Sequence, residues 1–191
     1  MKPDGTLFFL KRWIAHPLRM GAILPSSPRL AAEVAQCVLE TAADAPVLEL
    51  GAGTGTITRG LSRAGIPAER LWLVELDADM IAYLRTHFPG HNILQGDAST
   101  PLGLIPDGMH GRFGAVISGI PALQFPLERQ RRFVEDCFAL LRPGGTLVQF
   151  TYSLGSPLQY EALHLQARRA ATAFANVPPA HVWAYTRDGD N

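Results

Sequence analysis

A glycine-rich stretch that includes one acid, "ELGAGTG" (Glu49 to Gly55), follows an apolar run and precedes a helical pattern. Thr56 stands where the dinucleotide fingerprint G-x-G-x-x-G needs its last glycine, and the stretch also lacks the Gly-Lys-Ser/Thr of a P-loop. Glycines let the backbone approach a bulky ligand, and the acid suits a cation with an amino group better than a pyrophosphate. The pattern acid-x-G-x-G-x-G therefore predicts a binding loop for such a cation.

Further polar residues follow the next strand-like runs. Glu75 lies at the end of the second predicted strand, in "LWLVEL". Asp97 lies in "QGDA" after "NIL", and Ser118 opens "SGIP" directly after "FGAVI". Asp77 and Asp79 are interpreted as caps of the helix that comes next. Because the carboxyl ends of parallel strands meet at one edge of a sheet, we expect Glu49, Glu75 and Asp97 to gather around one ligand.

The elements that must position these residues alternate along the chain. Apolar runs at 46–51, 71–76, 91–96, 113–118 and 146–152 predict strands covered on both faces, and helical patterns lie at 54–65, 77–88 and 126–145. Ser27 and Pro28 predict the N-cap and first residue of an earlier helix. Residues 171–187 predict a last pair of strands joined by prolines. The sequence predicts a doubly wound α/β sheet.

Composition limits the remaining choices. The chain has 191 residues, 47% of them hydrophobic and 18% charged, which fits a single domain of helices at 1–45 and a core at 46–191. Lys plus Arg and Asp plus Glu both number 17, so no global field attracts nucleic acid. Cys37 and Cys137 are expected to be buried free thiols in a reducing cytosol. We find no signal peptide and no apolar run long enough to cross a bilayer.

The acid-x-G-x-G-x-G pattern resembles motif I of the class I S-adenosylmethionine methyltransferases. The resemblance implies a Rossmann-like, mostly parallel seven-stranded sheet with an antiparallel C-terminal strand pair, S-adenosylmethionine as cofactor and no metal. It implies that Glu75 accepts hydrogen bonds from both ribose hydroxyls and that Asp97 accepts one from the adenine amino group. The cofactor-binding residues that it implies are Ser26, Ser27, Glu49, Gly51, Gly53, Gly55, Glu75, Leu76, Asp97, Ala98 and Ser118.

Two outer stretches make the resemblance more specific. "FFLKRWIAHPLRMGAILPSSPRLA" (Phe8 to Ala32) and "NVPPAHVWAY" (Asn176 to Tyr185) resemble the terminal segments of bacterial phospholipid N-methyltransferases. That family methylates the amine of phosphatidylethanolamine and its intermediates towards phosphatidylcholine. The core also resembles the rRNA adenine dimethylases, whose motif at "SGIP" is of the Asn-Leu-Pro-Tyr/Phe type. Here Ser118 replaces the amide and Ala122 the stacking ring, so a small aliphatic amine is favoured over a flat base, although another unstacked nitrogen or oxygen nucleophile stays open.

Residues 6–19 predict a helix with large aromatics and the bases Lys11, Arg12 and Arg19. Such a helix suits peripheral contact with the cytoplasmic face of a membrane, or it covers the active site as a lid, or both. The amine must lose a proton before it attacks, and the candidates for that role are His16, Tyr152 and His181, with Ser118 beside the reacting group. Arg19, Arg168 and Arg169 are candidate phosphate ligands. A non-catalytic S-adenosylmethionine-binding module is the remaining alternative, and no oligomeric state is predicted.

Overall fold

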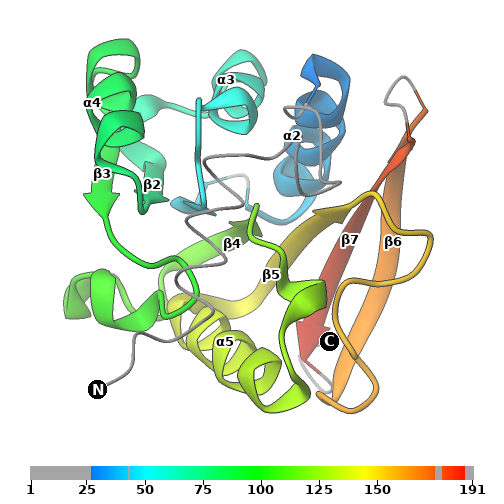
Figure 1. The fold of residues 1–191 in the computed structure, drawn as a ribbon. Helices are drawn as coiled ribbons and strands as arrows, with labels where there is room; N and C mark the ends of the chain where they lie inside the picture. Colours follow the sequence, from blue (N-terminus) through cyan, green and yellow to red (C-terminus); the bar gives the residue numbers. More distant parts are fainter. Residues whose placement is uncertain (1–26, 43, 175–177, 188–191) are drawn as a thin grey trace.

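The computed structural model describes residues 27–42, 44–174 and 178–187. Within these ranges four α-helices and seven β-strands follow one another (Figure 1). They are α2 (Pro28–Ala42), β1 (Val47–Leu50), α3 (Thr56–Arg63), β2 (Leu71–Glu75), α4 (Ala78–His87), β3 (Asn92–Gln95), β4 (Phe113–Ser118), α5 (Leu127–Leu140), β5 (Leu141–Thr151), β6 (Leu165–Ala173) and β7 (Ala180–Arg187). Short 3-10 turns join them, among them η5 (Ala122–Gln124).

The seven strands form one sheet in the order β3-β2-β1-β4-β5-β7-β6. The first five strands pair in parallel, and β7 is antiparallel to both β5 and β6. This confirms the predicted doubly wound sheet with its antiparallel C-terminal pair. The strand order reverses between β1 and β4, and in open α/β sheets ligands bind outside the carboxyl ends of the strands at such a point.

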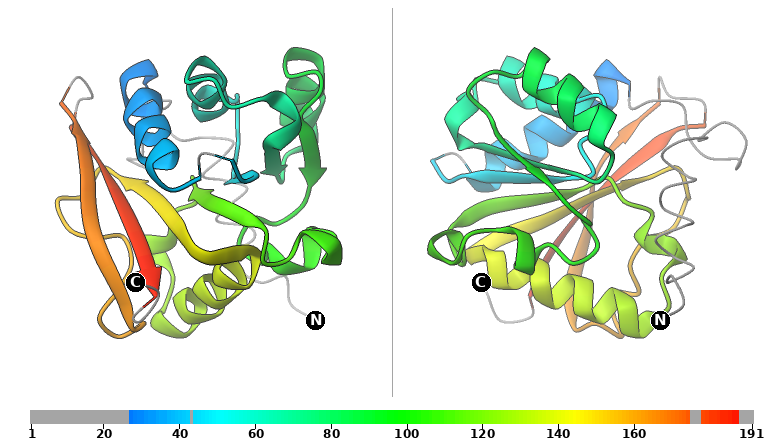
Figure 2. Two further views of the ribbon diagram at one scale, coloured as in Figure 1. Left: turned by 180° about the vertical axis from the view of Figure 1, so that it is seen from behind. Right: turned by 60° about the vertical axis from the view of Figure 1, so that its left-hand side comes forward.

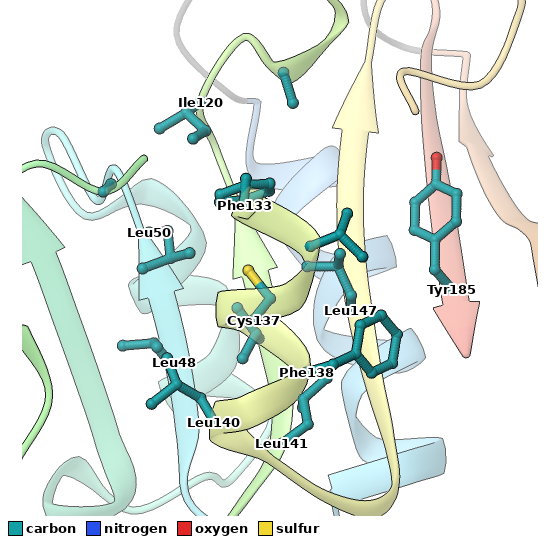
Figure 3. Packing of buried hydrophobic residues seen from close by; sticks show 14 of the residues in the cluster. Leu48, Leu50, Ile120, Phe133, Cys137, Phe138, Leu140, Leu141, Leu147 and Tyr185 are labelled. Atoms are coloured by element: carbon teal, nitrogen blue, oxygen red, sulfur yellow. The ribbon is translucent and has the colours of Figure 1, made fainter. Parts of the chain in front are cut away.

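Helices cover both faces of the sheet. Helices α2, α3 and α4 lie on one face and α5 lies on the other, as two further views confirm (Figure 2). On the α5 side, Phe133 and Cys137 pack with Leu48, Leu50 and Leu147 of the sheet (Figure 3). On the opposite side, α2 buries an apolar stripe against β4 to β7; the stripe consists of Leu30, Ala31, Val34, Ala35 and Val38. The sheet is therefore covered on both faces, as the unbroken apolar runs predicted.

Caps fix where two of the helices begin. Leu30 N donates to Ser27 Oγ at 3.1 Å, which confirms the predicted N-cap of α2. Asp77 Oδ1 accepts from Asp79 N at 2.9 Å and from Met80 N at 3.0 Å, so Asp77 caps α4 as predicted. Each cap places the start of its helix beside the carboxyl ends of the strands.

The start of β5 differs from the prediction. The strand begins at Leu141, five residues before the predicted run at 146, and it takes in the Pro-Gly-Gly segment at 143–145, which ends the helical pattern predicted at 126–145. Its pairing with β4 shifts register between Phe113 and Ala115, and Gly144 has a φ of 72°. The irregular pairing absorbs a segment whose proline and glycines favour a turn.

The described residues lack two features. Within 27–42, 44–174 and 178–187, no helix is long and apolar enough to cross a bilayer. The same ranges contain no group of three or more His, Cys, Asp or Glu side chains that could hold a metal ion. Cys37 and Cys137 are buried free thiols, as the sequence predicted.

Candidate active site

The loop after β1 forms the floor of the site. Gly51, Gly53 and Gly55 have φ angles of 79°, 54° and 71°, a region that side-chain-bearing residues rarely adopt. Gly51 N donates to Val74 O at 2.8 Å, and Gly119 N of the "SGIP" turn donates to Leu50 O at 2.8 Å. These bonds hold the loop between the ends of β2 and β4, where the strand order reverses.

The three glycines differ in what surrounds them. A Cβ on Gly55 would lie 2.4 Å from the Phe88 ring, and one on Gly51 would lie 3.2 Å from Ile120. A Cβ on Gly53 would meet nothing within 4 Å. Gly51 and Gly55 are thus packed against the protein, whereas the backbone at Gly53 borders open space. This is the fit expected of a loop that a bulky ligand approaches.

Glu75 lies at the end of β2 and is only 1% exposed. Its Oε2 accepts from Gly53 N at 2.8 Å, and its Oε1 accepts from Leu76 N at 2.7 Å and Asp77 N at 3.0 Å. A carboxylate offers about four lone-pair positions, so two ribose hydroxyls could be accepted only if one of these bonds gave way. The predicted ribose contact stays a prediction, and the structure adds that Glu75 ties the glycine loop to β2.

Glu49 is the acid of the glycine motif, and its side chain is 3% exposed. Burial raises the pKa of this carboxyl to about 8; the hydrogen bond from Thr58 lowers it and the charge of Glu75 raises it further. The Thr58 hydroxyl on α3 donates to Glu49 Oε2 at 2.6 Å. A carboxyl with this pKa changes charge near neutral pH, and a cationic ligand beside it would favour the charged form.

Asp97 follows β3, next to the end of β2. Gly96 N donates to Glu75 O at 2.9 Å, so the two predicted cofactor acids lie on neighbouring strand ends. Asp97 Oδ1 accepts from Ser99 N at 2.9 Å, which holds the turn that also contains the buried Ala98. The structure brings Glu49, Glu75 and Asp97 to the carboxyl ends of three adjacent strands, as predicted.

The predicted catalytic residues do not all come together. Ser118 is fully buried at the end of β4, on the face that α5 covers, and its Oγ has no hydrogen-bond partner. Tyr152 packs instead against the cluster on the α2 side. His181 on β7 is buried, and its Nδ1 lies 3.0 Å from Thr172 Oγ1. His16, Arg19 and Ser26 lie outside the described residues.

The predicted arginines and Ser27 have other contacts. Arg168 forms an ion pair with Glu40 at 3.2 Å, and both Arg168 and Arg169 lie within β6, away from the strand's carboxyl end. Ser27 caps α2 through its Oγ.

Sequence reasoning missed Gln149, a buried residue of β5 whose Nε2 donates to Ile120 O of the "SGIP" turn at 3.2 Å. The polar residue inside "TLVQFT" was the available signal.

The sheet order, the glycine loop and the three acids define a class I S-adenosylmethionine-dependent methyltransferase. The family model described as "Methyltransferase domain" matches residues 47–145, and the chain belongs to this family. S-adenosyl-L-methionine is its methyl donor. The residues that would hold it are the glycine loop, Glu49, Glu75 and Asp97, because Glu75 binds Gly53 N beside the open space at that glycine and the other two acids lie on or directly after the neighbouring strands.

One relative supports this assignment, and two solved structures share the fold. Ornithine lipid N-methyltransferase from Singulisphaera acidiphila is 30% identical over 146 residues, which cover 75% of this chain and 76% of that protein. The fold is similar to a 1,6-didemethyltoxoflavin-N1-methyltransferase from Burkholderia thailandensis, with a TM-score of 0.64 and 16% identity over 95% of this chain and 87% of that chain. It is also similar to an amino pentose methyltransferase from Micromonospora echinaspora, with a TM-score of 0.58 and 18% identity over 82% of this chain and 90% of that chain.

Proposed function

We propose that this chain methylates the amine headgroup of a membrane lipid, with phosphatidylethanolamine as the substrate expected from the sequence. The observation that carries the proposal is the environment of Ala122, the residue after "SGIP". It is fully buried, at 0% exposure, where a base-methylating enzyme would need an exposed aromatic ring. An aliphatic amine needs no stacking surface, whereas an adenine would lose stacking worth about 1–3 kcal/mol.

The similarity to an ornithine lipid N-methyltransferase supports a lipid amine. The name of that relative, like the proposal, places the methyl acceptor on a nitrogen of a lipid. Phosphatidylethanolamine and ornithine lipid both present an amine on a flexible polar headgroup. Each of these two lipids is therefore tested separately in the experiment described below.

Exposed apolar side chains support contact with a lipid surface. Among the described residues, the large hydrophobic side chains that are exposed are Leu123, Leu154 and Phe174, at 51%, 83% and 80%. They follow the ends of β4, β5 and β6, three strands that run in the same direction. All three therefore belong to the sheet edge that carries the site. We propose that this edge, together with the predicted helix at residues 6–19, faces the membrane.

The main contribution of the protein to the reaction is to orient the amine and the cofactor relative to each other. When bound, S-adenosylmethionine supplies a methyl group on a sulfonium, which an amine lone pair displaces in line. An alkylammonium has a pKa of about 10, so the amine must give up a proton to solvent or to a side chain before it attacks. Ser118, unpaired and buried at the end of β4, provides a hydroxyl oxygen that can accept an N–H of the amine.

Methyl transfer from labelled S-adenosylmethionine to vesicles tests the proposal. One set contains phosphatidylethanolamine in phosphatidylglycerol, a second ornithine lipid in phosphatidylglycerol, and a control set phosphatidylglycerol alone; ribosomal RNA forms a fourth arm. We expect label in an aminolipid arm and none in the control or the RNA. Label in RNA alone, or in no arm while S-adenosylhomocysteine still binds, would refute the proposal.

The edge is tested with the double variant Leu154→Ser, Phe174→Ser in cosedimentation with the same vesicles. We expect weaker sedimentation than for wild type at both low and high salt, because apolar contacts are not screened. The matched control replaces the exposed, charged residues Glu135 and Arg132 of α5 with Ser and should sediment like wild type. Equal sedimentation of the Leu154→Ser, Phe174→Ser variant and wild type would show that this edge of the sheet does not contact the membrane.

A further inference from the structure

Three buried polar atoms without partners lie in one row across the sheet. Among the described residues, the buried side-chain N and O atoms that lack a hydrogen-bond partner are His91 Nε2, Ser118 Oγ, Gln149 Oε1 and Trp183 Nε1. Ser118 on β4 is in register with Gln149 on β5, and Gln149 is in register with Trp183 on β7. Three of the four atoms therefore belong to directly neighbouring residues, here called the polar row.

The row lies on a single face of the sheet. Register partners point to the same side, and Ser118 and Gln149 each follow by two residues a member of the cluster beneath α5, namely Val116 and Leu147. Trp183 packs against that cluster as well. Figure 3 shows Leu147 and Tyr185, which occupy the next register position, side by side in this layer. Neighbouring side chains on one face lie about 5 Å apart at Cβ, so the three polar groups can meet without a backbone change.

The chemistry of the row is complementary. Gln149 Nε2 donates to Ile120 O at 3.2 Å, and because a carbonyl can only accept, this bond fixes which end of the amide is the oxygen. The free Oε1 has two lone pairs. Trp183 Nε1 carries one hydrogen and Ser118 Oγ carries another. One acceptor with two sites thus belongs to a residue whose two register neighbours each carry a donor.

We propose that Gln149 is a positioning residue whose Oε1 accepts a hydrogen bond from the Ser118 hydroxyl, so that Ser118 Oγ acts as an acceptor toward the substrate. Trp183 fills the second lone pair of Oε1, so the amide cannot turn away. Ser118 is left with lone pairs for an N–H and no proton to donate. The row therefore selects a nitrogen that carries hydrogen over a carbonyl or ether oxygen at the reacting position. This proposal rests on the proposed amine methylation, whose nitrogen it orients.

Kinetics of paired variants test the link between Gln149 and Ser118. Gln149→Met keeps the length of the side chain and removes its amide, and Ser118→Ala removes the hydroxyl. With vesicles of phosphatidylethanolamine in phosphatidylglycerol, or of the aminolipid found active, each should lower kcat/KM about tenfold, the value of one hydrogen bond. The double variant should lower kcat/KM by no more than about tenfold, because both changes remove the same interaction. A loss of about a hundredfold would mean independent effects and would overturn the proposal.

Gln130 of α5 provides the matched control. It is also a buried glutamine, 1% exposed, and its Nε2 donates to Ala122 O at 3.2 Å and Phe125 O at 3.1 Å in the segment that follows the same turn. Its Oε1 also accepts from Gln159 N at 2.9 Å, so Gln130→Met removes more hydrogen bonds than Gln149→Met does, and it does not touch the row. Its effect should multiply with that of Ser118→Ala. S-adenosylhomocysteine affinity should be unchanged in Gln149→Met, which separates a positioning defect from loss of the fold.

A readout that needs no substrate distinguishes failure of the row from failure of the proposed function. The chain has three tryptophans, so a 15N-labelled sample gives three indole N–H signals, and Trp183→Phe identifies that of Trp183. Gln149→Met should shift this signal and speed its hydrogen exchange, whereas Gln130→Met should leave it in place. An unmoved signal refutes the row whatever the substrate is. A moved signal with no methylated aminolipid would refute the proposed function and keep the hydrogen bond from Trp183.

Discussion

Cofactor binding should release a proton from Glu49. The pKa of this buried carboxyl is raised to about 8, above its ordinary value of 4.5, chiefly because burial disfavours the charge. At pH 7 about nine in ten molecules therefore carry the proton before the cofactor binds. The amino group of S-adenosylmethionine or S-adenosylhomocysteine beside this acid favours the carboxylate, so binding at pH 7 should release about 0.9 proton, and about 0.5 at pH 8.

Calorimetry with S-adenosylhomocysteine in two buffers of different ionisation enthalpy measures this number directly. Between about pH 5 and pH 7, affinity should rise by up to about tenfold per pH unit, because each unit removes most of the cost of deprotonation. Glu49→Gln should abolish the release and flatten the pH dependence. Glu135→Gln, which changes an exposed acid on α5, should behave as wild type. Release near zero in wild type at pH 7, or full release in Glu49→Gln, would refute the assignment of Glu49 to the cationic end of the cofactor.

The same carboxyl makes stability depend on pH. Because its pKa in the folded protein is about 8 and its ordinary value is 4.5, the folded state holds the proton more tightly than the unfolded chain. The stabilising contribution is complete below about pH 4.5 and is lost as the pH rises through about 8. Urea unfolding of wild type and Glu49→Gln should therefore diverge between pH 5 and about pH 8, with wild type losing on the order of 1 kcal/mol per pH unit more than the variant, and the difference should level off above that pH.

Substitutions at four further positions have defined outcomes. Gly55→Ala should lower the thermal midpoint strongly, since its Cβ would meet the Phe88 ring at 2.4 Å. Gly53→Ala should retain the fold and weaken S-adenosylhomocysteine binding, because a Cβ there meets no neighbouring atom and only the positive φ disfavours it. Equal melting temperatures of the two variants would contradict this. Glu75→Gln should cost about 2–3 kcal/mol of stability and at least tenfold in S-adenosylhomocysteine affinity, since its carboxylate accepts from three backbone amides; unchanged calorimetry and unfolding would exclude a role. If Tyr152 relays the proton, Tyr152→Phe should slow turnover at neutral pH, and turnover should recover at higher pH. If the ring only surrounds the cation, Tyr152→Phe should have no effect and Tyr152→Ala should lower activity. Full activity of both variants would remove Tyr152 from the site.

The sequence by itself determined the elements and the positions of the three acids. Unbroken apolar runs predict buried parallel strands because a strand covered on both faces has no polar side to show. Ser27 and Asp77 could be read as helix caps because a cap bonds an amide only two or three residues away. Glu49, Glu75 and Asp97 could be placed together because parallel strands bring their carboxyl ends to one edge. These inferences depend on local spacing or on a fixed topology, which a sequence carries.

Tertiary structure alone decided how those groups share hydrogen bonds. The sequence did not predict that Glu75 would clamp Gly53, 22 residues away, or that burial beside Thr58 would raise the pKa of Glu49. It also gave no sign that Ser118, Gln149 and Trp183 would stand in register, because β7 enters the sheet between β5 and β6, out of chain order. Which strand neighbours which, and in what register, depends on the packing of α2 and α5 onto the two faces. Burial and register are properties of the whole sheet, so they exist only once the chain has folded.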